Sequence, residues 1–233
     1  MKRRQFLLYA CSAISLMLTL GVNLVACGAG STVNWKEEVL LHDGQKLIVK
    51  RSHTYGGYGE IGQGRLIAHM TTTFTIPGTH QTVTWESDFG RGYQDNLDLL
   101  ILDFMNGTPY IATSPAFCHA YNKWGRPNPP YVYFKYDGSA WRRIPLKEFP
   151  EEFKEANVVI ATKADEKYLT RTPVSSEQVK NLNSSISEFK PPLARTPIKN
   201  DTTVGCEELI FYKGAWIGPG EDSIGRKMMD RKF

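Results

Sequence analysis

Long apolar runs, runs of basic residues and closely spaced histidines are scarce in this chain of 233 residues. The longest largely apolar run, Phe6 to Leu20, is shorter than the roughly 20 residues that a membrane-spanning helix needs. The five histidines show neither the HxH nor the HxxxH spacing of a local metal site, so we predict no metal and no other cofactor. No G-x-S-x-G, S-x-x-K or P-loop motif occurs, and no catalytic residue is assigned.

Excess positive charge is confined to the amino terminus. The formal net charge is +4, but removal of Lys2, Arg3 and Arg4 leaves 25 basic against 24 acidic residues. No stretch of this remainder interleaves Lys and Arg with aromatic residues, so we predict no nucleic-acid partner. A charged start followed by a short apolar run is the pattern of a signal peptide, here residues 1–26.

A cysteine ends the apolar segment. The sequence Leu24-Val25-Ala26-Cys27 resembles the lipobox of bacterial lipoproteins. This resemblance implies that the sulfur of Cys27 receives a diacylglycerol and that Cys27 becomes the new amino terminus. Stable anchoring needs more than one acyl chain, because a single chain binds a bilayer only marginally. We therefore predict a membrane partner reached through lipidated Cys27, followed by a flexible tether over residues 27–34.

Two export routes stay open. The sequence Arg3-Arg4-Gln5-Phe6-Leu7 resembles a twin-arginine signal, whereas the charged start and apolar run also fit the general secretory route. Gly28 rather than aspartate follows Cys27, which by resemblance to Gram-negative lipoproteins permits transfer to the outer membrane. We predict a domain that faces the periplasm, with the outer membrane favoured over the inner one.

Only two cysteines remain once Cys11 and Cys27 are set aside. In an oxidising compartment, Cys118 and Cys206 indicate one disulfide, and two buried free thiols are the alternative. A catalytic Cys118 paired with His119 is disfavoured, because neighbouring residues on a strand point to opposite faces.

The globular part, residues 35–217, has the pattern of an antiparallel β protein. Short apolar or alternating runs are separated by turn signals, namely His42-Asp43-Gly44-Gln45, Pro77-Gly78, Asn106-Gly107, Asp137-Gly138-Ser139 and Lys213-Gly214-Ala215. The first four turns predict a meander of about eight strands. The predicted fold class is mainly β, as a sandwich or a barrel-like sheet, with Leu99 to Leu102 as a central strand because it is apolar on both faces.

Two short helices are predicted toward the carboxyl end. The first covers residues 149–157, where a proline near the start and acidic residues in the first turn favour a helix. The second begins at a capping box formed by Ser175 and Gln178 and extends to about residue 185. Residues 158–161 are predicted as a strand, and residues 218–233 as a polar tail that frays.

The densest cluster of aromatic and proline residues lies between Tyr121 and Tyr131. Three prolines stiffen this loop, and its rings and one guanidinium could contact a ligand at low ordering cost. One interpretation is a recognition loop for a sugar or a peptide edge, with Tyr121, Trp124, Arg126 and Tyr131 as candidate binding residues. The other is a stiff loop whose rings are buried against the sheet, with Cys118 clamping its base.

Two stretches carry a family resemblance, Tyr121-Asn122-Lys123-Trp124-Gly125-Arg126-Pro127-Asn128-Pro129-Pro130-Tyr131 and Trp141-Arg142-Arg143-Ile144-Pro145-Leu146. With them the chain resembles a family of uncharacterised proteobacterial lipoproteins, from Trp35 to about Val159. The resemblance implies a bacterial envelope location and no particular activity.

Two functional hypotheses follow from these observations. The first is a lipid-anchored envelope protein that binds a protein or glycan partner, or serves a structural role, without catalysis. The second is a periplasmic hydrolase that acts on cell-wall or glycan material through a pair of carboxylates. The acids available for such a pair are Glu86, Asp88, Asp95, Asp98 and Asp103.

Overall fold

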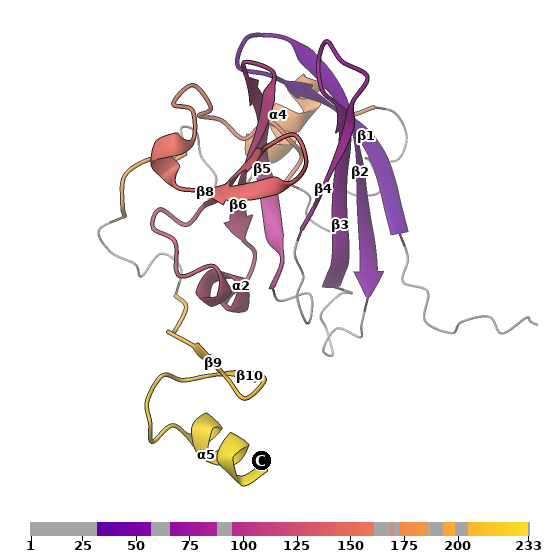
Figure 1. Ribbon diagram of the computed structural model, residues 1–233. Coiled ribbons are helices and arrows are strands. Elements are labelled where there is room, and N and C mark those ends of the chain that lie inside the picture. The colour runs from indigo at the N-terminus through magenta and orange to yellow at the C-terminus, as the bar shows by residue number, and fades with distance from the viewer. Residues whose placement is uncertain are drawn as a thin grey trace, which may run out of the picture. The chain divides into compact units, whose positions relative to one another are not determined.

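A computed structural model of the chain describes residues 32–56, 66–87, 95–160, 169, 173–184, 186, 193–198 and 205–232 (Figure 1). The predicted signal peptide, Cys27 and Asp88 lie outside these ranges. Within the described ranges, no helix has both the length and the apolar character needed to cross a membrane.

The first sheet is an antiparallel meander in the order β1-β2-β3-β4. Its strands are β1 (Thr32–Leu40), β2 (Lys46–Gly56), β3 (Leu66–Thr75) and β4 (Thr82–Glu86). Gly44 has a φ of +85° in the turn between β1 and β2, a conformation that glycine adopts without steric cost. The first two predicted hairpins are thus confirmed.

The second sheet is also an antiparallel meander, in the order β5-β6-β7-β8. Its strands are β5 (Leu97–Met105), β6 (Thr108–Pro115), β7 (Val132–Tyr136) and β8 (Trp141–Ile144). Asn106 and Gly107 have φ values of 51° and 74°, as a type I′ hairpin requires. The predicted hairpins are confirmed, but β5 is an edge strand and not the central strand that its apolar composition indicated.

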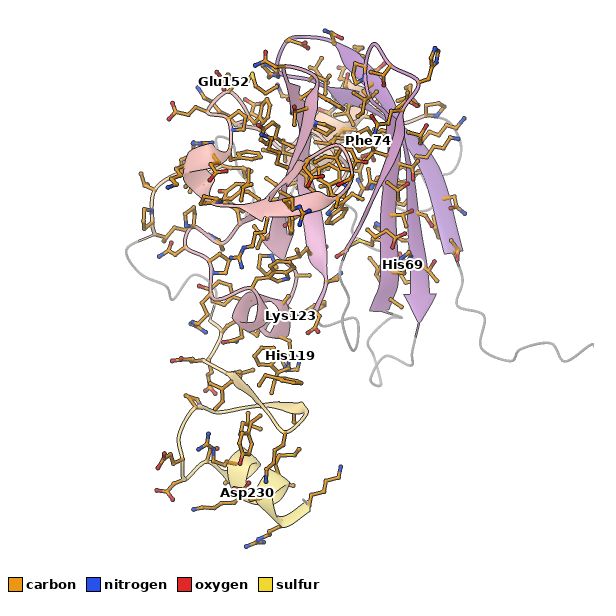
Figure 2. All side chains as sticks on the ribbon, in the orientation of Figure 1. His69, Phe74, His119, Lys123, Glu152 and Asp230 are labelled. Carbon is orange, nitrogen blue, oxygen red and sulfur yellow. A yellow bond between two sulfur atoms is a disulfide. The ribbon has the colours of Figure 1, made fainter. Side chains whose placement is uncertain are left out.

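The two sheets pack face to face around one apolar core. Phe74 of β3, labelled in Figure 2, lies in this core. Its ring meets that of Phe104 of β5 edge to face, with ring centroids 5.6 Å apart. The core also contains Val39, Val49, Val83 and Trp85 from the first sheet and Leu99, Leu102, Ile111 and Phe134 from the second. The mainly β prediction is confirmed, and of its two forms the described strands build the sandwich.

A second apolar cluster covers the outward face of the second sheet. Ile101, Tyr110 and Tyr133 of that sheet contact Phe149 and Phe153 from the following segment. This segment begins with a 3₁₀ turn, Leu146–Glu148, and continues through turns and irregular backbone. The predicted helix over 149–157 and the predicted strand over 158–161 were therefore wrong as far as these residues are described.

The free edge of β5 explains this departure from the predicted helix. The backbone N–H of Asn157 donates to the carbonyl of Leu100 at 3.0 Å. Its side-chain amide bonds both the N–H and the carbonyl of Leu102, at 3.0 and 2.9 Å, and donates to the carbonyl of Leu40 at 3.1 Å. Unpaired edge groups of a buried strand need partners, and they obtain them from Asn157.

The predicted capping box is confirmed at the start of α4 (Ser176–Ser184). Gln178 Oε1 accepts from the Ser175 N–H at 2.9 Å, and the Gln178 N–H donates to Ser175 Oγ at 3.3 Å. Val174 and Val179 then pack with Trp35 of β1 in a third apolar cluster. The helix therefore closes one side of the sandwich, next to the edge strand β1.

The carboxyl-terminal part is attached through a disulfide between Cys118 and Cys206, which confirms that prediction. Cys118 begins a short helix, α2 (Cys118–Lys123), which overlaps the start of the predicted aromatic loop. After the disulfide come a hairpin, β9 (Ile210–Tyr212) and β10 (Ala215–Ile217), and a helix, α5 (Ile224–Lys232). The predicted fraying tail thus contains a helix, none of whose residues is buried.

Candidate functional site

The predicted recognition loop turns two of its four candidate residues inward. Tyr121 is 1% exposed and Tyr131 is 8% exposed. The guanidinium of Arg126 lies over the Tyr121 ring, 4.9 Å from its centroid, and donates to the carbonyl of Cys206 at 3.1 Å. The hydrogen bond to Cys206 attaches the loop to the carboxyl-terminal segment, beside the disulfide that joins Cys118 to Cys206.

Trp124 is the partly buried member of the same loop. Its ring meets Phe134 of the core edge to face at 5.5 Å, and the Arg143 guanidinium lies 5.4 Å from its centroid. Arg143 also donates to the Trp124 carbonyl at 2.9 Å. The interpretation of a stiff loop that buries its rings therefore accounts for all four candidate residues.

An open groove of about 460 Å³ lies between this loop and β8. It is lined mainly by prolines and by Tyr131, Tyr133 and Leu146. Its polar groups already have protein partners, because the Asn128 side chain bonds the backbone N–H and carbonyl of Ile198 at 2.7 and 3.0 Å. Arg143 also lines the groove, and its guanidinium donates to the Trp124 carbonyl. The charged and amide groups of the groove thus already bind protein atoms.

The carboxylates proposed for hydrolysis have separate partners. Glu86 lies 3.6 Å from His69, and Asp95 lies 3.3 Å from Lys123. Asp98 is partly buried. Burial of its carboxyl group raises its pKa to about 6, although the positive charge of Arg51 opposes this shift. Among the described residues, no three His, Cys, Asp or Glu side chains are grouped so that they could hold a metal ion.

Asp103 forms a pair with His42 that the sequence did not indicate, since 61 residues separate them. Its Oδ1 lies 2.8 Å from His42 Nδ1, and its Oδ2 accepts the His42 N–H at 2.9 Å. The N–H of Phe104 donates to Oδ1 at 2.7 Å. Burial raises the pKa of Asp103, and the hydrogen bonds from His42 and Phe104 oppose this shift without cancelling it. The pair lies beside an open cleft of about 310 Å³ and attaches the β1–β2 turn to β5.

A buried ion pair lies inside the first sheet. Arg51 Nη1 is 2.9 Å from Glu37 Oε1, and the Trp35 indole donates to Glu37 Oε2 at 2.7 Å. The same carboxylate accepts the N–H of Val159 at 3.2 Å, which joins the segment after Asn157 to the first sheet. These charges neutralise each other, so the pair has a positional role in the interior.

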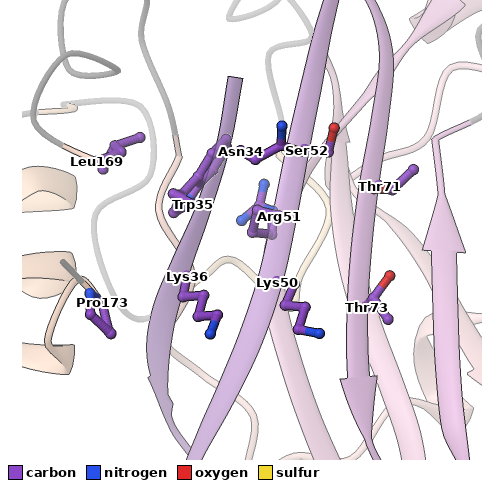
Figure 3. A pocket seen from close by; sticks show the side chains of 10 residues that line it. All are labelled: Asn34, Trp35, Lys36, Lys50, Arg51, Ser52, Thr71, Thr73, Leu169 and Pro173. Carbon is purple, nitrogen blue, oxygen red and sulfur yellow. The ribbon is translucent and has the colours of Figure 1, made fainter. Parts of the chain in front are cut away.

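The outward face of the first sheet carries two lysines that form no ion pair with the residues that the structure describes. Lys36 of β1 and Lys50 of β2 are directly opposite in the register, and both are exposed (Figure 3). Within the described residues, the lysine ion pairs involve Lys46, Lys123, Lys213 and Lys227 instead. Like charges opposite each other on antiparallel strands repel. A bound anion between the two ammonium groups would relieve that repulsion.

The two lysines line a pocket of about 510 Å³ on this face. Polar neighbours that could also bind an anion are Asn34, Ser52, Thr71 and Thr73 (Figure 3). Leu169 and Pro173 add apolar lining beside β1. A volume of this size is typical of small-molecule sites.

Lys46, on the same face, differs from Lys36 and Lys50 because it forms an ion pair. Lys46 lies 2.8 Å from Glu38 Oε1, and this bond, with those from Ser176, lowers the pKa of Glu38 to about 2. The sequence analysis did not indicate this pair, because the predicted turn over residues 42–45 is centred between Asp43 and Gly44 and would place Lys36 opposite Arg51. In the structure Leu40 pairs with Lys46, and this register places Lys36 opposite Lys50.

No protein-family model, no curated protein and no solved structure matches this chain. The resemblance to uncharacterised lipoproteins therefore stays a prediction, and the functional proposal rests on the residues described above.

Proposed function

We propose that the protein is a lipid-anchored protein of the bacterial cell envelope that binds a ligand without catalysis, through the lysine pocket on the first sheet. The observation that supports binding is the pair Lys36 and Lys50, opposite each other in a pocket and lacking a counterion within the described residues. The anchor is Cys27, and the domain faces the periplasm, with the outer membrane favoured because Gly28 follows the anchor.

The disulfide supports a location outside the cytoplasm. Disulfides persist in oxidising compartments such as the periplasm and are rare in the cytosol. Cys118 and Cys206 are joined across 88 residues. This bond agrees with the signal peptide and the lipobox in the first 27 residues.

The anchor is tested by replacing Cys27 with alanine in the full chain. We expect the parent to run at the mature mass with attached acyl chains and to fractionate with membranes. C27A should keep its signal peptide and lack acyl chains. Cys11→Ala, within the signal peptide, is the matched control and should be processed like the parent. Equal mature masses and membrane retention for parent and C27A would contradict the anchor.

A hydrolase that acts on cell-wall or glycan material is the second candidate, and the His42–Asp103 pair beside a cleft favours one that cleaves amide or ester bonds of such material. A carboxylate that orients a histidine recurs in hydrolytic sites. Both Asp103 oxygens already accept hydrogen bonds that hold the β1–β2 turn, which ranks this candidate below binding. Purified parent incubated with peptidoglycan should release no new amino groups, and release that Asp103→Asn abolishes in a folded variant would reverse the ranking.

A further inference from the structure

The lysine pocket is complementary to a singly or doubly charged anion with several acceptor oxygens. Two ammonium groups face outward on adjacent strands, and Asn34, Ser52 and Thr71 place amide and hydroxyl groups around them. Phosphate oxygens accept hydrogen bonds from all of these groups. Phosphate is thus the ligand chemistry that the pocket fits.

Exposed aliphatic side chains accompany the lysines on the same face. Leu40 is 45% exposed and Ile48 is 50% exposed, and both have the outward orientation of Lys36 and Lys50 in the strand alternation. A soluble phosphate ester makes no use of such side chains. A lipid surface presents phosphates next to acyl chains and uses both kinds of group.

The chain between anchor and sheet is short. Four residues separate Cys27 from Thr32, the first residue of β1. At full extension this segment spans no more than about 18 Å. Lys36 lies four residues farther along β1, which adds about 13 Å. A protein anchored at Cys27 therefore holds the lysine pocket within reach of the headgroups of its own membrane.

We propose that the Lys36–Lys50 pocket binds the phosphate headgroup of an anionic lipid in the membrane that holds the anchor, so that the outward face of the first sheet lies against the bilayer. This inference rests on the proposed lipid anchor. Leu40 and Ile48 then contact the acyl boundary, while the second sheet faces away from the bilayer surface.

Amine labelling of the acylated full chain tests this proposal. The protein is reconstituted into vesicles of phosphatidylcholine alone or of phosphatidylcholine with phosphatidylglycerol, and the acetylation rate of each lysine is measured by mass spectrometry. We expect Lys36 and Lys50 to react about fivefold more slowly in the anionic vesicles, since each basic side chain at such a surface gains about 1 kcal/mol. High salt should remove the difference.

Exposed lysines on another part of the chain are the internal control. Lys154 and Lys180 should react at equal rates in both vesicles. Lys46, on the docking face, should be protected in the parent and in K154Q/K180Q but not in K36Q/K50Q. Because all the substituted lysines are exposed, both variants should keep the parental melting temperature.

Two results would overturn the proposal. One is equal labelling of Lys36 and Lys50 in the two kinds of vesicle. The other is equal protection by glycerol 3-phosphate added to phosphatidylcholine vesicles, which would assign the pocket to a soluble ester. Both results leave the anchor intact, because acylation at Cys27 is measured separately by mass.

Discussion

The two sheets of this protein have the same four-stranded meander but use their second faces differently. In the first sheet, β1 and β2 alternate between buried and exposed residues, and the outward row remains exposed or partly exposed. In the second, β5 is buried on both faces, because residues 146–160 and Leu193 cover it. Sheets with one polar face can remain in contact with water, whereas sheets that are apolar on both faces must be covered.

This difference in covering indicates which sheet has a face that a ligand can reach. The chain that follows β8 covers the second sheet itself and satisfies the free edge of β5 through Asn157. The first sheet presents hydroxyl, amide, ammonium and carboxylate groups instead. The outward face of the first sheet is therefore the surface that we assign to binding, and substitutions in the two sheets should have different effects.

The largest effect is expected from breaking the attachment beside the second sheet. Replacing Cys118 and Cys206 together by serine removes a bond across 88 residues. A loop of this length corresponds to about 4–5 kcal/mol of unfolding free energy in the chain-entropy model. Urea unfolding should show this loss, and reduction of the parent should reproduce it. An unchanged midpoint in both experiments would mean that the bond does not constrain the unfolded chain.

A buried charge should matter more than an exposed one. Arg51→Met leaves Glu37, which is fully buried, without its cation, and we expect a loss of about 3–5 kcal/mol. Arg142→Met is the matched control, because Arg142 pairs with Asp137 at the exposed end of the second sheet. The control should show a much smaller loss, because solvent screens an exposed ion pair. Equal losses in urea unfolding would remove the distinction between the two pairs.

The comparison of the two outward faces has a direct test in a pair of isoleucines. Ile101 of β5 is 1% exposed beneath the covering segment, and Ile48 of β2 is 50% exposed. Ile101→Ala should lower the unfolding free energy by about 3 kcal/mol, because it leaves a cavity. Ile48→Ala should change it by less than about 0.5 kcal/mol. A large loss for I48A in the detergent-solubilised protein would show that the first sheet is covered as well.

The smallest effect concerns the pH dependence of stability. Burial raises the pKa of Asp98 to about 6, so the folded protein holds this proton more tightly than the unfolded chain does. Its ionisation therefore costs stability as the pH rises from about 4 to about 6. Asp98→Asn should remove that slope and gain about 2 kcal/mol at neutral pH.

Asp137 provides the opposite sign as a control. Hydrogen bonds, chiefly from Arg142, lower the pKa of Asp137, so its contribution is lost as the pH falls through the folded pKa. Asp137→Asn should therefore flatten the acid side of the profile and leave the window between about pH 4 and 6 unchanged. Thermal unfolding across pH separates the two variants, and the same slope in D98N and the parent would contradict the role of Asp98.

Much of the fold could be predicted because its signals are local. Asn106-Gly107 adopts the positive φ values that a two-residue hairpin needs, and Ser175 caps α4 through Gln178, three residues away. The segment after Phe149 could not be predicted in this way. Proline and acidic residues favour a helix there, but Asn157 instead forms hydrogen bonds with the unpaired backbone groups at the edge of β5.

The candidate site divides along the same line. The aromatic loop is the most prominent cluster in the sequence, but its rings are buried or partly buried because they pack on Phe134 and on the carboxyl-terminal segment. The two lysines were inconspicuous, since 14 residues separate them and neither belongs to a motif. Their significance depends on strand register and on the absence, among the described residues, of a carboxylate in ion-pair contact with them, since the nearby Glu38 pairs with Lys46. Both are properties of the folded chain.

The sequence by itself determined the strands and turns of the two meanders and the start of α4, because turn conformations, caps and alternation depend on neighbours a few residues apart. It indicated the disulfide by composition, since Cys118 and Cys206 are the two cysteines that remain once Cys11 and Cys27 are set aside. The tertiary structure decided which sheet is covered, how the backbone runs over residues 149–160, and which lysines lack an ion pair among the described residues. These outcomes depend on contacts between residues far apart in the chain, such as Asn157 with Leu40 and Arg51 with Glu37, and no local pattern encodes them.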